Sequence, residues 1–237
     1  MKKGLFVLLS LLLFAACDKE YDNHYTIERL ASVTEYNADG SKMTVKSYKY
    51  YDDGYSVTTT LDDVLQGVSH FTYAEKLEIQ TDSAVVDGVL KPSSVTTVYY
   101  HDFERREVDS VLTVNSAGEV TLREEFYYDG ASYSVITYKD TVQTAKRIIH
   151  SYYGTVSADF YTFDTESGAW KYSYNEQTVT STEYDLTTIM VYVDNQPTEK
   201  TMYQSSKESV EFKRYTYSDS SWTMVAYGKY KYETITI

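Results

Sequence analysis

Short turn signals divide this chain into segments of strand length. Each signal combines Gly, Asn, Asp, Ser or Pro, which favour tight turns through left-handed backbone, fixed φ or local side-chain hydrogen bonds. Consecutive strands joined by short turns are antiparallel neighbours, so the pattern predicts a meander, with weaker turns hidden in the wider gaps. The signals are Asn37–Gly40, Asp52–Gly54, Asp87–Gly88, Asn115–Gly118, Asp129–Gly130, Glu166–Gly168, Asp194–Pro197 and Ser218–Ser221.

The residues between these turns are strand formers. After residue 16 the chain holds 29 Thr, 22 Val and 27 Tyr among 221 residues, and all three types suit a pleated, half-buried surface. No window of a dozen residues carries an apolar stripe at helical spacing. The sequence therefore predicts an all-β chain without a long helix.

The predicted core is poor in aliphatic residues. Only 44 of the 221 residues are Leu, Ile, Val or Phe, so Tyr must supply part of the buried surface. Strict alternation in the segment 120–128 puts Val120, Leu122, Glu124, Phe126 and Tyr128 on one face, which is not purely apolar. The other face of the segment is mixed as well. This favours an extended twisted sheet or a loosely closed barrel over a dry sandwich.

Two stretches look like copies of one hairpin. Asn37–Gly54 and Asn115–Gly130 each read Asn-x-x-Gly, a strand, Tyr-Tyr-Asp and Gly, and Tyr215–Tyr227 is a worn third copy. The pattern resembles the Tyr-Asp hairpin repeats of RHS-type proteins and the Tyr-rich β lipoproteins of Bacteroidota. The resemblance implies a sheet of repeated hairpins. Because RHS repeats build large shells, we expect this shorter chain to enclose nothing.

The N-terminus carries processing information. Lys2 and Lys3 precede an apolar run that ends at Ala16 and is too short to span a bilayer, which predicts a secretory leader at residues 1–16. The small residues before Cys17 resemble the lipobox of bacterial lipoproteins, and this resemblance implies lipid attachment at Cys17. The alternative is a free cysteine beside an ordinary cleavage site.

The segment after Cys17 is acidic. Residues 17–24 are similar to the tether that sends Bacteroidota lipoproteins to the cell surface, although Asp18 leaves a periplasm-facing position open. The lipid would attach the protein to the outer membrane. Residues 25–237 are expected to form a single all-β repeat domain.

Several classes of function lose their usual support. The net charge of −13 with no basic cluster disfavours nucleic-acid binding, and one cysteine allows neither an intramolecular disulfide nor a thiolate zinc site. The four histidines have no metal-binding spacing, and the catalytic Ser and phosphate-loop motifs are missing. Neighbouring acidic residues such as Asp52 and Asp53 point to opposite faces of a strand and are better interpreted as turn residues. We expect no enzyme activity, no cofactor and no metal.

The one chemically suggestive feature is aromatic spacing. Four Tyr-x-Tyr pairs each place two rings about 7 Å apart on one strand face, because side chains alternate along a strand. Trp170 and Trp222 lie near turns and are candidate rim anchors. If these rings are exposed, they can form a platform that binds a ligand. If they are covered, they only pack against neighbouring strands and stabilise the sheet. The pairs are Tyr48 and Tyr50, Tyr172 and Tyr174, Tyr215 and Tyr217, and Tyr230 and Tyr232.

These observations favour a non-catalytic lipoprotein of the cell envelope whose Tyr-rich platform binds a glycan or a protein partner. One alternative is an accessory subunit of an outer-membrane complex, docked through the same rings and an unpaired strand edge. Another is an acidic immunity or inhibitor lipoprotein.

Overall fold

The computed structural model describes residues 26–41, 43–206 and 209–236. The predicted leader, the lipidation site Cys17 and the acidic tether lie outside these residues. The described residues form sixteen strands and contain no helix. The strands are β1 (Thr26–Asn37), β2 (Met43–Tyr51), β3 (Gly54–Leu61), β4 (Val64–Ala74), β5 (Leu77–Val86), β6 (Val89–Asp102), β7 (Glu107–Asn115), β8 (Val120–Asp129), β9 (Ser132–Lys139), β10 (Val142–Tyr152), β11 (Thr155–Asp164), β12 (Ala169–Glu183), β13 (Leu186–Val193), β14 (Gln196–Ser205), β15 (Ser209–Ser218) and β16 (Ser221–Thr236).

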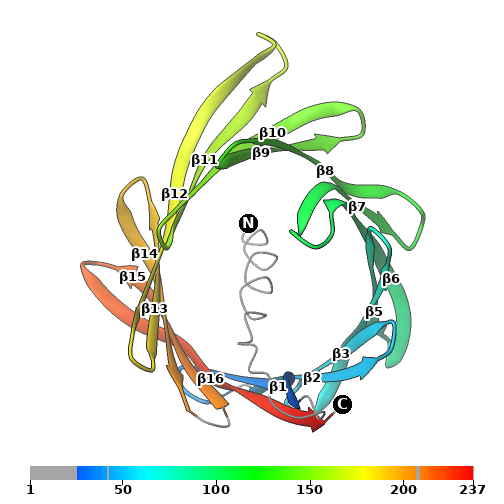
Figure 1. Ribbon diagram of the computed structural model, residues 1–237, viewed down its shortest axis with the longest axis vertical. Helices are drawn as coiled ribbons and strands as arrows, with labels where there is room; N and C mark the ends of the chain where they lie inside the picture. Colours follow the sequence, from blue (N-terminus) through cyan, green and yellow to red (C-terminus); the bar gives the residue numbers. More distant parts are fainter. Residues whose placement is uncertain (1–25, 42, 207–208, 237) are drawn as a thin grey trace.

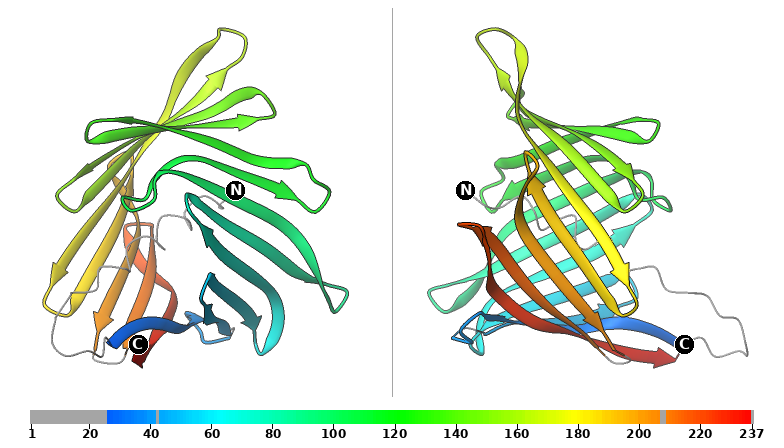
Figure 2. Two further views of the ribbon diagram at one scale, coloured as in Figure 1. Left: turned by 45° about the vertical axis from the view of Figure 1, so that its right-hand side comes forward. Right: turned by 90° about the vertical axis from the view of Figure 1, so that its left-hand side faces the viewer.

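The strands form a closed antiparallel barrel in sequence order (Figure 1). β1 and β16 close it with Val33 opposite Tyr230 and Tyr36 opposite Tyr227. Figure 2 shows the strands inclined across the wall, with the β11–β12 hairpin projecting beyond the others. The predicted all-β meander is confirmed, in its barrel form.

Closure corrects two expectations. Every described strand has a neighbour on both sides, so the unpaired edge proposed for docking is absent from this part of the chain. The expectation that the chain is too short to surround an interior is also wrong, because one layer of short strands closes with far fewer residues than a large shell needs. A 16-stranded barrel is too wide for its own side chains to fill.

All eight predicted turns lie between consecutive strands. In the two repeat copies the same bond closes the turn: Gly40 N donates to Asn37 O at 2.8 Å, and Gly118 N donates to Asn115 O at 3.0 Å. Both glycines have left-handed backbone, with φ of 72° and 82°. Other turns use residues with weaker turn signatures in that conformation, such as Tyr184 with φ of 53°.

Alternate residues divide into an inner and an outer face. One set contains Val57, Val135, Ile149 and Phe212, all 9% exposed or less. The register connects these residues to one face of the sheet, and the opposite face carries exposed rings such as Tyr172, 56% exposed. Side chains crowd on the concave side of a closed sheet, so we assign the covered set to the inner face.

β-Bulges interrupt the predicted alternation. In β8 a register shift opposite Thr113 and Val114 leaves Thr121 unpaired and puts Val120 on the outer face. Leu122, Glu124, Phe126 and Tyr128 keep the expected common face, which is the inner one. The prediction for this strand is thus correct except at Val120, because a bulge adds one residue to the period of two.

Candidate functional site

The register gathers aromatic side chains on the inner face of one half of the barrel. Tyr48 and Tyr50 of β2 lie near Tyr55 of β3, with ring centroids 6.2 and 5.8 Å from it. Tyr55 stacks on Phe71 of β4 at 4.4 Å with the ring planes 7° apart. Tyr73 of the same strand continues the series, with its ring 6.3 Å from Tyr55.

The series continues toward the β6–β7 turn, and a second group of rings lies on the same face beyond β1. Phe103 of the β6–β7 turn lies 6.3 Å from Tyr73 and 5.0 Å from Tyr100, between ring centroids. Across β1, Phe212 packs 5.4 Å from Tyr230, and Tyr203 lies 6.2 Å from Tyr230. We call the whole set the inner aromatic stripe; in Figure 1 its strands form the lower half of the ring. The stripe consists of Tyr203, Phe212, Tyr230, Tyr48, Tyr50, Tyr55, Phe71, Tyr73, Tyr100 and Phe103.

Phenol groups give the stripe a polar component. Tyr50 donates to the carbonyl oxygen of Leu30 at 2.9 Å, and Tyr100 donates to Glu78 at 3.0 Å. Burial is the main cause that raises the pKa of both phenols to about 12. Burial also raises the pKa of Tyr55 well above its ordinary value. The stripe therefore combines ring faces with protonated, half-buried hydroxyl groups.

Three arginines on the inner face form ion pairs with glutamates. Arg214 pairs with Glu35 at 3.2 Å, and Arg147 pairs with Glu124 at 3.0 Å. At one end of the stripe, Arg106 lies 3.5 Å from the carboxylate of Glu78. Its guanidinium also covers the Phe103 ring at 4.7 Å.

Two carboxylates on the inner face, Asp82 and Glu176, form no ion pair with an arginine. Asp82 of β5 accepts from the Ser69 hydroxyl at 2.5 Å and from Ser94 at 3.2 Å, which are neutral donors. Burial, followed by the charge of Glu199, raises the pKa of Glu176. The inner face therefore has an excess of acidic groups.

The predicted platform residues fall on both faces. Tyr48, Tyr50, Tyr230 and Tyr232 face inward. Tyr215 and Tyr217 face outward, as do Trp170 and Trp222. The prediction that Tyr172 and Tyr174 share a face is wrong, because a bulge at Ser173 puts Tyr172 outside and Tyr174 inside.

The outward residues form two separate clusters. Trp222 packs 5.0 Å from Tyr217, and Lys200 lies over Trp222 and Tyr215 at 4.8 and 4.7 Å. Trp170 meets Phe163 edge-on at 5.0 Å. The stripe also contains residues that sequence analysis did not propose, chiefly Phe71, Tyr73 and Tyr203. Among the stripe residues that were not proposed, only Tyr55 is indicated by a sequence pattern, because it follows the repeated Tyr-Tyr-Asp turn.

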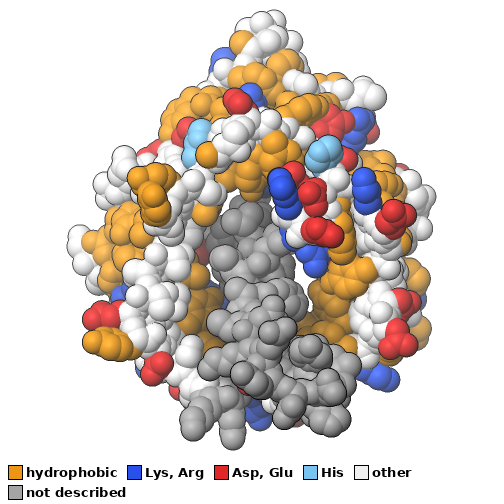
Figure 3. All heavy atoms as spheres, viewed as in Figure 1, with side chains coloured by type: hydrophobic (Ala, Val, Ile, Leu, Met, Phe, Trp, Pro, Cys, Tyr) orange, Lys and Arg blue, Asp and Glu red, His pale blue; other side chains and the backbone are white. Residues whose placement is uncertain are grey.

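Basic residues interrupt the outer face near the middle of four strands. Arg123, Lys146, Lys200 and Lys213 point outward from β8, β10, β14 and β15. Figure 3 shows charged side chains interspersed among hydrophobic ones around the rim. In the part of the chain that the structure describes, no helix is long and apolar enough to cross a membrane.

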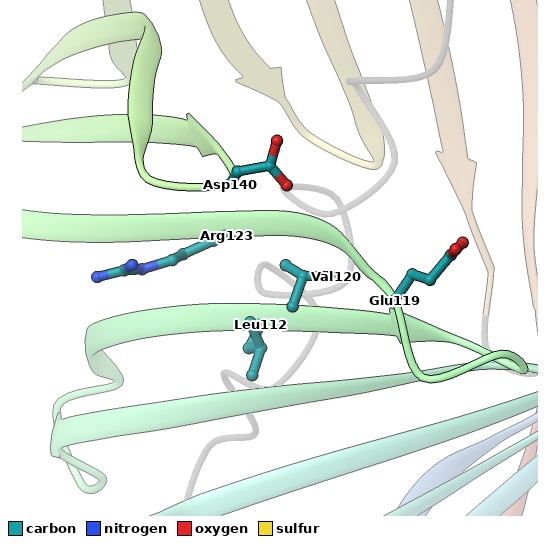
Figure 4. Close-up of a pocket in the computed structure, with 5 residues that line it drawn as sticks. All are labelled: Leu112, Glu119, Val120, Arg123 and Asp140. Carbon is teal, nitrogen blue, oxygen red and sulfur yellow. The ribbon is translucent and has the colours of Figure 1, made fainter.

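A depression of about 740 Å³ lies on the outer face at β7 and β8 (Figure 4). Leu112, Val120 and Arg123 line it with Glu119 and Asp140, and the Arg123 side chain extends away from both acids. Its guanidinium pairs with Glu125 and covers the Tyr138 ring at 4.8 Å. The depression thus lacks the converging polar groups of a catalytic site. Among the described residues, no cluster of His, Cys, Asp or Glu is arranged to hold a metal ion.

Comparison with known proteins supports the fold. A crystal structure of a porin-like protein from Bacteroides uniformis matches with a TM-score of 0.52 and 11% identity, over 87% of this chain and 96% of that one. A protein of unknown function from Bacteroides fragilis matches with a TM-score of 0.26 and 12% identity, over 63% of this chain and 89% of that one. No protein-family model and no curated protein matches the sequence, so the resemblance to lipoproteins and RHS repeats gains no support there. The first match shows a β-barrel fold shared with a Bacteroides protein.

Proposed function

We propose that this protein is a non-catalytic, lipid-anchored protein of the cell envelope that binds a glycan along its inner aromatic stripe. The observation that carries the proposal is the run of ring contacts from β2 to the β6–β7 turn, with a second group of rings on the same inner face across β1. Sugar rings present apolar C–H faces and hydroxyl groups, and the stripe offers flat rings beside phenols and carboxylates. Ligand sites commonly combine aromatic walls with a few positioned polar groups.

The outer face favours a barrel in water, held to the membrane by lipid on Cys17. A Lys or Arg at the lipid-facing midplane of a transmembrane barrel costs about 2–4 kcal/mol. Four such residues lie near the middle of their strands, namely Arg123, Lys146, Lys200 and Lys213. The porin-like neighbour is compatible with an envelope location, and the four basic residues on the outer face favour the lipid anchor as the means of attachment.

Binding can be tested by substituting the stacked pair at the centre of the stripe. We expect Tyr55→Leu to weaken binding of a glycan by about tenfold or more, as for a buried aromatic contact at the centre of an interface. The matched control is Tyr36→Leu, since Tyr36 stacks on Tyr227 at 5.2 Å on the outer face. Titration of purified lipidated protein in detergent with a glycan panel, followed by Trp fluorescence and calorimetry, measures both affinities.

Two results would contradict the proposal. Equal losses of glycan affinity in Tyr55→Leu and Tyr36→Leu would show that the stripe is not the binding surface. Recovery of a shortened glycan after long incubation would contradict the non-catalytic assignment.

A further inference from the structure

We infer that the ligand of the inner aromatic stripe is an uncharged glycan, and that the inner face rejects glycans bearing carboxylate or sulfate groups. This inference rests on the proposed function and adds the chemical class of the ligand. It follows from which charges on the inner face already have partners.

The arginines that reach the inner face are engaged. Arg214 holds Glu35, Arg147 holds Glu124, and Arg106 holds Glu78. Lys46 is engaged as well, and Lys171 pairs with Asp164 at 2.5 Å. Lys91 and Lys139 also face inward by register, but they lie at the turn ends of the β5–β6 and β9–β10 hairpins, outside the stripe. An acidic glycan that lies along the stripe would therefore need to break an existing ion pair to gain a cation there.

Carboxylates without a cationic partner lie near the middle of strands β5, β12 and β14 on the inner face. Asp82 is stabilised by hydroxyl and amide donors, with Gln80 adding a bond at 2.9 Å, so its charge is not neutralised. Glu176 and Glu199 lie on the same face and repel each other electrostatically. A third negative charge from a ligand would be repelled by both groups, most strongly at low ionic strength.

The position of these acids also distinguishes an uncharged ligand from a cationic one. Asp82, Glu176 and Glu199 lie outside the stacked series of rings, whereas Glu35 and Glu78 beside the stripe are already paired. The stripe itself therefore presents rings and phenols rather than free carboxylates. A ligand that follows these rings makes its contacts without carrying a charge.

Matched pairs of glycans test the inference with the intact lipidated protein. Polygalacturonate is compared with its carboxyl-reduced form, and chitosan oligomers with their N-acetylated form, within a panel of neutral glucans, mannans, xylans and galactans. We expect the neutral member of each pair to bind more tightly than its charged form, with an affinity that changes less than about twofold between 20 and 500 mM NaCl.

The outcomes separate the inference from the proposed function. Equal or tighter binding of an acidic glycan, or of chitosan over its neutral form, overturns the inference while leaving glycan binding intact. Absence of binding across the whole panel overturns the proposed function, and the inference with it. A loss of affinity above about fivefold in high salt also overturns the inference, since an uncharged ligand has no ionic contact to screen.

Charge variants provide a second measurement. In the double variant Glu176→Gln and Glu199→Gln, repulsion of polygalacturonate falls, and its apparent affinity at 20 mM NaCl should rise about two- to fivefold. The neutral glycan should bind the variant unchanged. The matched control is Glu211→Gln, which removes an outer-face carboxylate that is 69% exposed in its side chain. A rise of the same size in the control would assign the repulsion to overall net charge and contradict the inference.

Discussion

Substitution of Gly228 tests the seam that closes the barrel. Gly228 of β16 lies opposite Glu35 of β1 and Phe212 of β15. An added Cβ would lie 2.0 Å from the carbonyl oxygen of Thr34 and 2.7 Å from two carbons of the Phe212 ring. The Thr34 carbonyl would have to move by about 1 Å to reach even a 3.0 Å contact.

The expected cost of Gly228→Ala combines two effects. Overpacking of a well-packed site costs about 1–3 kcal/mol, and a disturbed ladder hydrogen bond adds about 1 kcal/mol. We therefore expect a loss of about 2–4 kcal/mol in the free energy of unfolding, measured by urea denaturation with Trp fluorescence. The added Phe212→Leu change should recover part of the loss by removing ring atoms near the new methyl group.

The matched control is Gly118→Ala in the exposed β7–β8 turn. A Cβ there meets nothing within 4 Å, so only the left-handed backbone with φ of 82° is strained, at about 1–2 kcal/mol. If Gly228→Ala destabilises the protein no more than this control, the close approach of β1 and β16 is refuted.

Three further predictions concern pH, a turn and an ion pair. Burial raises the pKa of Tyr50 and Tyr100 to about 12, above the ordinary value of about 10, so their contribution to stability is complete below about pH 10 and lost as pH rises through about 12. The urea midpoint should fall between pH 10 and 11.5, less so in Tyr50→Phe, and a flat midpoint would contradict this. Asn115→Ala should cost about 1 kcal/mol, because Asn115 Oδ1 accepts from the backbone N–H groups of Ala117 and Glu119, both at 2.9 Å. Asn37→Ala should cost only a few tenths, since the Asn37 side chain donates one bond at 3.4 Å, and equal losses would be inconsistent with these contacts. A double-mutant cycle on Glu35 and Arg214 should give a coupling of about 0.5–1 kcal/mol, against nearly zero for the exposed Glu211 and Lys229 pair at 3.8 Å; the reverse order would contradict the inner position of Arg214.

The sequence predicts the turns and strands of this barrel better than its closure. Asn37–Gly40 and Asn115–Gly118 are readable because the left-handed position is occupied by Gly. The turn at Asp62 and Asp63 is harder to predict, since neither residue requires the left-handed conformation that both adopt, with φ of 48° and 64°. The β1–β16 pairing joins residues about 200 positions apart and depends on the accumulated twist and register of every strand between them. A short sequence pattern therefore cannot predict this accumulated twist and register, and with it the closure of the barrel.

The same limit explains why the residues of the inner aromatic stripe are only partly predictable from the sequence. The first repeat copy puts Tyr50 opposite Tyr55 on the inner face, and the second puts Tyr128 opposite Tyr133 on that face, with similar ring separations of 5.8 and 5.5 Å. In the worn third copy the corresponding rings, Tyr217 and Trp222, lie on the outer face.

Local sequence fixes which residues of a hairpin meet, but the face they occupy depends on the bulges before and inside that hairpin, because each bulge reverses the alternation. A Tyr-x-Tyr pattern therefore marks a pair of rings reliably only where the strand is unbulged, as in β2, and fails where a residue such as Ser173 is inserted. The inner aromatic stripe is consequently a property of the complete register of the barrel.

A single-residue insertion in the middle of β3 should thus move part of the stripe to the outer face and abolish glycan binding while the protein retains β structure by circular dichroism. An insertion of the same size in the exposed turn at Gly88, with nothing within 4 Å of a Cβ at that glycine, should leave binding intact. Binding retained by the β3 insertion would show that the stripe is not the ligand surface.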